Sequence, residues 1–307
     1  MKIWLERSIL KDHYVEMIKN SLPTHEIVTD LSDASDAEVA ITMPQFVKKE
    51  MLDQIPHLKF IKLLTAGYNQ INLADIKQRG ITLAYAKDVF SIQIAEDVVA
   101  KILYFNRRLP LYDEHMRKHE WVFERVDHEL YHSTVGIIGA GSIGTEVAKR
   151  LKAFGCHILG YRRNHVLDAN YDELFHDRKG LESLLERSDY IIIALPLSDE
   201  TKHFIGENEF KHMKNTALII NVARGEVIDQ KALINALNQG FIRGAGLDVT
   251  TPEPLPQNDP LWQARNIFIT PHQASSSPMI HERLMLEVID TLNAYFEDRP
   301  LTNLVTL

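Results

Sequence analysis

The sequence predicts an α/β fold with two doubly wound parallel-sheet domains. Short apolar runs alternate with amphipathic stretches along almost the whole chain, which is typical of βαβ units. The later runs are apolar throughout, as expected of strands in a sheet that helices cover on both faces. The length of 307 residues allows two domains, since a domain usually has about 100–200 residues.

The first part of the chain supplies the strands and helices of one predicted sheet. Strands are predicted at residues 1–5, 38–43, 60–65 and 81–84, with helices at 9–20 and 73–79. A longer helix is predicted at residues 91–108, because Ile94, Val98 and Ile102 recur at helical spacing. Pro110 has no backbone N–H to donate, so we expect it to end this helix.

The second part of the chain repeats the alternation of strands and helices. Strands are predicted at residues 134–138, 156–161, 190–195, 217–222, 244–249 and 267–270. A last helix is predicted at residues 280–296. No internal repeat of fixed period and no low-complexity linker is found, so the two predicted sheets are distinct units rather than copies.

Composition and charge exclude several classes of protein. Lys and Arg number 34 against 42 Asp and Glu, and the net charge of −8 disfavours nucleic acid and anionic membranes as partners. No apolar run approaches the roughly 18 residues that a transmembrane helix needs, and the charged N-terminus does not resemble a signal peptide. Cys156 is the single cysteine, which excludes a disulfide framework. We therefore expect a cytoplasmic protein.

A zinc-protease pattern is present but lacks its structural context. Residues 128–132 read H-E-L-Y-H, and this motif binds zinc only on a helix, where positions four apart share one face. A strand is predicted to begin at Thr134, two residues later. We therefore predict no metal site.

A glycine motif indicates a dinucleotide-binding site. Residues 139–144 read G-A-G-S-I-G, after a predicted strand and before a predicted helix. In this context the first glycine permits a tight turn, the second lets the backbone approach a pyrophosphate, and the third lets helix and strand pack closely. The helix N-terminus then offers N–H groups to the phosphates. The predicted cofactor contacts are Gly139, Gly141, Ser142, Ile143 and Gly144.

Two arginines bear on which dinucleotide is bound. An acidic residue that grips the ribose 2′-hydroxyl of NAD is expected about 20 positions after the glycines. Arg162 and Arg163 stand there instead. A guanidinium pairs well with a 2′-phosphate, so NADP(H) is preferred and NAD(H) is possible. The alternative is that these arginines lie on a solvated loop with no contact to a ligand.

The chain resembles the D-isomer-specific 2-hydroxyacid dehydrogenase family, and within it the glyoxylate/hydroxypyruvate reductase branch. The motifs that carry the resemblance are Ala95-Glu96, the glycine motif, Asn221–Gly225, Leu247–Val249, Glu253-Pro254, Pro260–Trp262 and Thr270–His272. The resemblance implies a Rossmann cofactor domain, residues 99–281, inserted into a flavodoxin-like substrate domain, residues 1–98 plus 282–307. It also implies a cleft between the domains and pairing into a homodimer.

Three residues are predicted to carry the chemistry. Reduction of a 2-oxo acid needs a proton donor, and His272 suits this role because imidazole titrates near neutrality. Glu253 could pair with the other ring nitrogen of His272, and Arg224 could bind the substrate carboxylate or polarise the carbonyl. Each follows a predicted strand, where ligands of open α/β sheets bind. Taken singly, each could instead be a surface residue.

Further contacts are implied by the resemblance alone. Backbone N–H groups of Ala66 and Gly67 would bind the substrate carboxylate, although this segment could be an ordinary glycine turn. Asp248 would contact the nicotinamide carboxamide, although it could be a capping or turn residue. The remaining implied cofactor contacts are Leu195, Pro196 and Ala223.

The sequence therefore predicts an NADPH-dependent reductase of a small 2-oxo acid such as glyoxylate or hydroxypyruvate. Two alternatives stay open. One is an NAD-dependent D-2-hydroxyacid or phosphoglycerate dehydrogenase, which shares the motifs. The other is a cofactor-sensing scaffold similar to the C-terminal binding protein corepressors.

Overall fold

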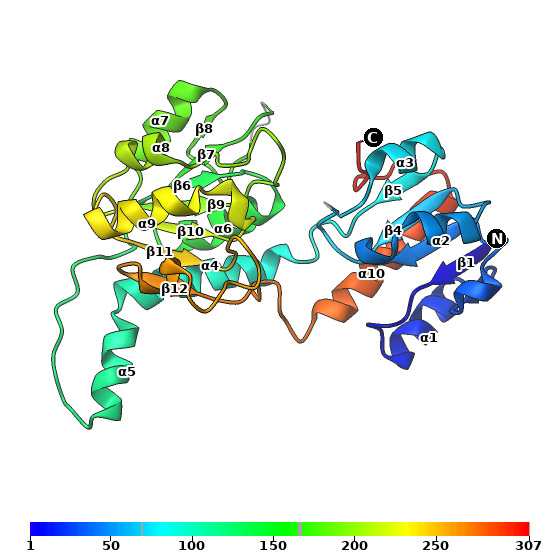
Figure 1. The fold of residues 1–307 in the computed structure, drawn as a ribbon, viewed down its shortest axis with the longest axis horizontal. Coiled ribbons are helices and arrows are strands. Elements are labelled where there is room, and N and C mark those ends of the chain that lie inside the picture. The colour runs from blue at the N-terminus through cyan, green and yellow to red at the C-terminus, as the bar shows by residue number, and fades with distance from the viewer. Residues whose placement is uncertain (69, 165–167, 307) are drawn as a thin grey trace. The chain divides into compact units, whose positions relative to one another are not determined.

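The computed structural model of the chain describes residues 1–68, 70–164 and 168–306 (Figure 1). It divides into two compact units, Met1–Phe90 with Ser277–Leu307 and Ser91–Ser276. Both boundaries fall a few residues before the predicted ones, 98/99 and 281/282. The first difference arises because the long helix α4 (Ser91–Asn106) packs in the second unit against α6 (Ser142–Ala153).

The first unit is a parallel sheet covered by helices. In its described residues, five strands are arranged in the order β2-β1-β3-β4-β5. Their bounds are Lys2–Leu5 (β1), Glu26–Val28 (β2), Val39–Thr42 (β3), Phe60–Leu63 (β4) and Thr82–Ala84 (β5). The helices are α1 (Asp12–Ser21), α2 (Lys49–Gln54), α3 (Leu73–Gln78) and α10 (Ile280–Phe296). Helix α10 comes from the end of the chain and packs against α1 (Figure 1).

The second unit holds the larger sheet. Its described residues form seven parallel strands in the order β12-β11-β10-β9-β6-β7-β8. Their bounds are Thr134–Ile138 (β6), His157–Tyr161 (β7), Glu173–Phe175 (β8), Tyr190–Ile193 (β9), Leu218–Asn221 (β10), Gly244–Leu247 (β11) and Ile267–Ile269 (β12). Besides α4 and α6, the helices are α5 (Leu109–Arg117), α7 (Arg178–Arg187), α8 (Glu207–His212) and α9 (Gln230–Gln239). The strand order reverses beside β6, which is where a doubly wound sheet binds its ligand.

The predicted α/β class, with two parallel sheets, is confirmed. Strands β2 and β8 were not predicted, because each has only three residues and begins with a glutamate. Pro110 does follow the end of α4, but it also lies in the first turn of α5. Proline suits that position because the first N–H groups of a helix have no partner within it.

An arm, which we define as residues 109–127, extends from the second unit (Figure 1). It comprises α5 and the segment that follows it. The arm exposes large apolar side chains: Trp121 and Phe123 have relative exposures of 104% and 89%, and Met116 has 66%. Large apolar side chains with such exposure are common at protein–protein interfaces.

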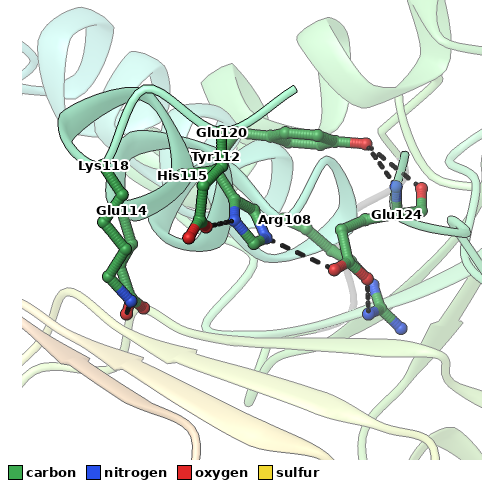
Figure 2. Close-up of polar contacts among 7 residues, drawn as sticks. All are labelled: Arg108, Tyr112, Glu114, His115, Lys118, Glu120 and Glu124. Carbon is green, nitrogen blue, oxygen red and sulfur yellow. Dashed lines mark hydrogen bonds and ion pairs between the residues drawn. The ribbon is translucent and has the colours of Figure 1, made fainter. Parts of the chain in front are cut away.

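Within the arm, a polar cluster fixes the segment after α5 to the helix (Figure 2). His115 Nδ1 lies 2.8 Å from Glu120 Oε2, and His115 Nε2 lies 3.4 Å from Glu124 Oε1. The hydroxyl of Tyr112 donates to the carbonyl of Glu124 and accepts from its N–H. Arg108 pairs with the Glu124 carboxylate at 3.4 Å. The segment after α5 is therefore held by contacts to side chains of the helix and its N-terminal flank.

The described residues were predicted to contain neither a metal site nor a membrane-spanning helix, and the structure bears on both points. Residues 128–132, the H-E-x-x-H segment, form a loop rather than a helix. No group of three His, Cys, Asp or Glu side chains in the described ranges converges as metal ligands would. Among the same residues, no helix is long and apolar enough to cross a membrane.

Candidate active site

The candidate residues follow neighbouring strands of the larger sheet. Arg224 comes after β10, Asp248 after β11 and His272 after β12, and these three parallel strands pair in register, with Asn221 opposite Leu247 and Leu247 opposite Ile269. The carboxyl ends of parallel strands meet at one edge. The three residues therefore emerge at the same edge of the sheet, beside the loops that follow β9, β6 and β7.

His272 and Glu253 form a close pair at this edge. His272 Nδ1 lies 2.7 Å from Glu253 Oε2, and Glu253 Oε1 accepts the backbone N–H of Thr250 at 3.2 Å. An ionised carboxylate only accepts hydrogen bonds, so the contact places a proton on Nδ1. Within the described residues, Nε2 of His272 has no hydrogen-bond partner. That nitrogen can therefore exchange a proton with a ligand, while Glu253 holds the ring.

The backbone at His272 adopts an unusual conformation that Asp248 helps to hold. The φ angle of His272 is +50°, in the left-handed region that few non-glycine residues occupy. Its N–H donates to the carbonyl of Asp248 at 2.8 Å and to that of Thr270 at 3.0 Å. These hydrogen bonds thus fix the backbone from which the His272 side chain extends, although the side chain itself is 43% exposed.

The side chain of Asp248 is buried and accepts three hydrogen bonds from the segment that carries His272. Its Oδ1 accepts the hydroxyl of Thr270 at 2.6 Å and the N–H of Gln273 at 2.9 Å, and its Oδ2 accepts the N–H of Ala274 at 2.9 Å. This carboxylate organises residues 270–274. The contact with a nicotinamide carboxamide, predicted from the resemblance, stays a prediction.

Arg224 presents a guanidinium that has no counter-ion among the described residues. The side-chain amide of Asn221 donates to the Arg224 carbonyl at 3.1 Å and accepts the N–H of Ala223 at 3.0 Å, which shapes the turn after β10. Arg224 Nη1 donates to the carbonyl of Ala223 at 2.6 Å. In the described part of the chain, no carboxylate lies within ion-pair distance of Arg224. A substrate carboxylate could therefore be its partner.

The glycine loop fits a dinucleotide. Gly139 has φ +106°, and a Cβ added there would come within 2.5 Å of the carbonyl carbon of Ala194. A Cβ on Gly144 would lie 2.4 Å from the carbonyl oxygen of Gly139, so helix and strand pack at glycine distance. A Cβ on Gly141 would meet no atom within 4 Å, so this side of the loop is open. Helix α6 begins directly afterwards, at Ser142, with its free N–H groups.

The two arginines predicted to read the 2′-position lie after β7, the strand next to β6. Arg163 forms an ion pair with Glu200, and both side chains are exposed. Arg162 is half-buried, its carbonyl accepts a hydrogen bond from His176 Nδ1 at 2.9 Å, and its charge helps to lower the pKa of Asp168. The two arginines thus differ in their surroundings, and their contact with a 2′-phosphate stays a prediction.

The remaining predicted contacts lie at different places. Leu195 and Pro196 follow β9, and Ala223 is buried after β10, so all three lie at the same sheet edge. Ala66 and Gly67 follow β4 in the first unit, where the hydroxyl of Thr65 donates to the Gly67 carbonyl at 2.8 Å. Their contact with a substrate stays a prediction.

Sequence reasoning missed a polar stripe on α4, formed by Gln93, Asp97 and Lys101. These residues lie four apart in the helix and are largely buried in the structure. Gln93 donates to the carbonyl of Ser275 at 3.1 Å, close to His272 in the chain. The sequence did contain a signal for this stripe. Its polar residues recur every four positions, which is the spacing of one helix face.

The chain is similar to known oxidoreductases along most of its length. Residues 99–274 match the family model for the "D-isomer specific 2-hydroxyacid dehydrogenase, NAD binding domain". A glyoxylate reductase of Korarchaeum cryptofilum is 33% identical, over 97% of this chain and 91% of that protein. A glyoxylate reductase of Thermococcus gammatolerans is 36% identical, over 90% of this chain and 80% of that protein.

Two solved structures share the fold along nearly the whole chain. A D-isomer specific 2-hydroxyacid dehydrogenase family protein of Aeromonas salmonicida superposes with a TM-score of 0.87 and 28% identity, covering 99% of this chain and 98% of that one. An acyclic imino acid reductase in complex with NADPH and D-Arg superposes with a TM-score of 0.85 and 27% identity, covering all of both chains.

Proposed function

Because the chain belongs to the D-isomer-specific 2-hydroxyacid dehydrogenase family, and is therefore a nicotinamide-dependent oxidoreductase, we propose that it uses NADPH to reduce a small 2-oxo acid to the 2-hydroxy acid. The proposed substrates are of the glyoxylate and hydroxypyruvate class. The observation that carries the proposal is the His272–Glu253 pair at 2.7 Å, on the sheet edge that also bears Arg224 and the glycine loop. The glyoxylate reductases among the relatives support the substrate class.

The chemistry divides among the chain's own residues. Bound NADPH would supply a hydride to the carbonyl carbon. His272 would give the proton on Nε2 to the carbonyl oxygen, which completes the alcohol. Glu253 would keep the ring oriented and stabilise the imidazolium. Arg224 would pair with the substrate carboxylate, and we propose that the N–H groups of Ala66 and Gly67 bind it as well.

Direct assay separates this function from its alternatives. Initial rates are measured for glyoxylate, hydroxypyruvate, pyruvate and 3-phosphohydroxypyruvate, with NADPH and NADH in parallel. We expect kcat/KM to be highest for one of the first two acids with NADPH. Highest activity on the phosphorylated acid, or with NADH, would favour the dehydrogenases left open by the sequence. No turnover with any 2-oxo acid would contradict the proposal.

The preference for NADPH is proposed to depend on Arg162. A hydrogen bond to a charged group contributes about 1.5–3 kcal/mol, so Arg162→Asp should lower the NADPH/NADH ratio of kcat/KM by about 10- to 100-fold. The NADPH complex of a structural neighbour supports this choice of cofactor. Arg163→Asp is the matched control and should act less, because Glu200 already pairs with Arg163. An unchanged ratio in Arg162→Asp would remove the argument.

We also propose that two copies of the chain associate as a homodimer. The exposed Trp121 and Phe123 of the arm support this, because apolar side chains with such exposure are usually covered by a partner. Light scattering should give the mass of a dimer for the wild type and a lower mass for Trp121→Ser/Phe123→Ser. A monomeric wild type at micromolar concentration would contradict it.

A further inference from the structure

The polar stripe on α4 needs a physical reason, because burial of polar groups is costly. Gln93 and Lys101 are 5% and 1% exposed, and the Asp97 side chain is 13% exposed. Burial raises the pKa of Asp97, and its ion pair with Lys101 opposes that shift. A buried ion pair often contributes little to stability compared with apolar residues of the same shape. The stripe therefore invites an explanation other than stability.

Two residues of the stripe contact the segment that carries His272. Gln93 Nε2 donates to the carbonyl of Ser275 at 3.1 Å. Gln273 Nε2 donates to Asp97 Oδ1 over a longer 3.5 Å, and Asp97 Oδ2 accepts from Lys101. The α4 side chains in both contacts come from one face of the helix, and their partners, Gln273 and Ser275, follow His272 closely in the chain.

The stripe also lies next to β11, the strand that directly precedes Asp248. A Cβ on Gly246 of β11 would come within 3.3 Å of Lys101 Cδ, so the Lys101 stem packs directly on that strand. The Asp248 carboxylate in turn accepts three hydrogen bonds from residues 270–274. Residues 270–275 are thus held by Asp248, which directly follows β11, and, independently, by α4.

The start of the same helix reaches the glycine loop. The hydroxyl of Ser91 lies 2.5 Å from that of Ser142, the first residue of α6. One rigid helix therefore contacts the loop that would bind the cofactor phosphates and the segment that would deliver the proton. Such a helix can set the distance between the two.

We propose that Gln93 and Asp97 are positioning residues, which hold the segment 270–275 so that His272 stands in place for proton transfer. This inference rests on the proposed reductase function. Neither residue need touch substrate or cofactor. Asp97 acts through Gln273, and Gln93 acts through the Ser275 carbonyl. A displacement of about 1 Å at a reacting group can cost about 100-fold in rate, so weak but directional contacts of this kind matter.

The experiment compares two double variants that share Lys101→Met and differ only at position 97. Asp97→Asn/Lys101→Met removes the ion pair but retains an oxygen for Gln273, whereas Asp97→Leu/Lys101→Met removes both. We expect kcat of the first within about twofold of wild type and kcat of the second about tenfold lower. The KM for NADPH should be unchanged in both. Glu96→Gln, which removes an exposed charge one position away, is the control and should match wild type.

A second pair of measurements tests whether Asp97 acts through Gln273 and whether Gln93 acts independently of it. Adding Gln273→Leu should abolish the difference between the two double variants, because Asp97 would then have no group to act on. Gln93→Leu should lower kcat through the other contact and leave the KM for NADPH unchanged. Thermal melting of every variant establishes that each is folded at the assay temperature.

The outcomes are separable from those of the proposed function. Equal kcat in the two double variants, or a fall in NADPH affinity as large as the fall in kcat, would overturn the positioning role. In either case wild type would still reduce the 2-oxo acid and His272→Ala would still be impaired. If wild type reduces no 2-oxo acid, or His272→Ala is as active as wild type, the proposed function itself fails.

Discussion

Among the histidine–glutamate pairs of the second unit, two have nearly the same distance and different surroundings. His272 and Glu253 lie 2.7 Å apart at the carboxyl edge of the sheet, and His115 and Glu120 lie 2.8 Å apart on the arm. The distance alone does not distinguish them. What distinguishes them is the second ring nitrogen of each histidine.

Both ring nitrogens of His115 are engaged by carboxylates. Glu120 takes Nδ1 and Glu124 takes Nε2, and the side chain is only 17% exposed. The hydrogen bond to Glu120 and the further contact with Glu124 raise the pKa of His115. A histidine held in this way joins two segments and has no nitrogen left for a substrate.

His272 has the opposite character. One nitrogen is held by Glu253, and within the described residues the other has no partner. Its backbone is fixed in a left-handed conformation by Asp248 and Thr270, whereas His115 lies in a regular helix. The comparison teaches that an oriented ring with one available nitrogen suits acid–base chemistry, and a doubly paired ring suits structure.

The largest effect is expected from removal of the His272 imidazole, and removal of the His115 imidazole is the matched control. His272→Ala should lower kcat by about 10²–10⁴-fold, which is the usual contribution of acid–base catalysis. His115→Ala should leave kcat close to that of wild type. Steady-state assays with the best 2-oxo acid and saturating NADPH provide the measurement. Near-normal turnover of His272→Ala would mean that the two pairs do not differ in the way described.

A smaller loss of kcat is expected when Glu253 is changed, and the same change at Glu120 is the control. Glu253→Gln retains an acceptor for Nδ1 but loses the charge that stabilises the imidazolium, so kcat should fall by about 10- to 100-fold. Glu120→Gln makes the same chemical change on the arm and should leave kcat unchanged. Both variants are assayed beside wild type under identical conditions. Equal kcat for all three would show that Glu253 does not support His272.

The smallest effect is on stability and concerns His115. Since its folded pKa is raised, the paired imidazolium stabilises the fold fully below the unfolded pKa, near 6.5, and this contribution is lost as pH rises through the folded pKa. The groups facing the ring are Glu120 and Glu124, and Arg108 pairs with the latter. The Tm of wild type should therefore exceed that of His115→Gln at pH 5.5.

The pH dependence of that difference is the decisive measurement. Melting curves at pH 5.5, 7 and 9 should show the Tm advantage of wild type shrinking with each step. Ion pairs near the surface contribute little, so a shift of a few degrees at most is expected. A difference that is constant with pH would show that His115 contributes by packing and neutral hydrogen bonding alone.

The sequence by itself determined the features that depend on local pattern. Apolar runs predicted the parallel strands, and their order along the chain placed Arg224, Asp248 and His272 after successive strands. The glycine motif predicted a turn, an open side and a close contact, because each depends on one residue lacking a Cβ. Strands β2 and β8 escaped notice because they are short and polar at their first residue.

Only the tertiary structure decided which side chains share partners. The sequence could propose that Glu253 meets His272, but the 2.7 Å contact depends on how the loops after β11 and β12 fold over each other. Likewise, the three hydrogen bonds to Asp248 and the stripe of Gln93 and Asp97 arise from segments far apart in the chain. Periodicity reports which face of a helix or strand is buried. It carries no information on the group that the face will meet, and that group decides whether a polar residue orients a neighbour or only packs.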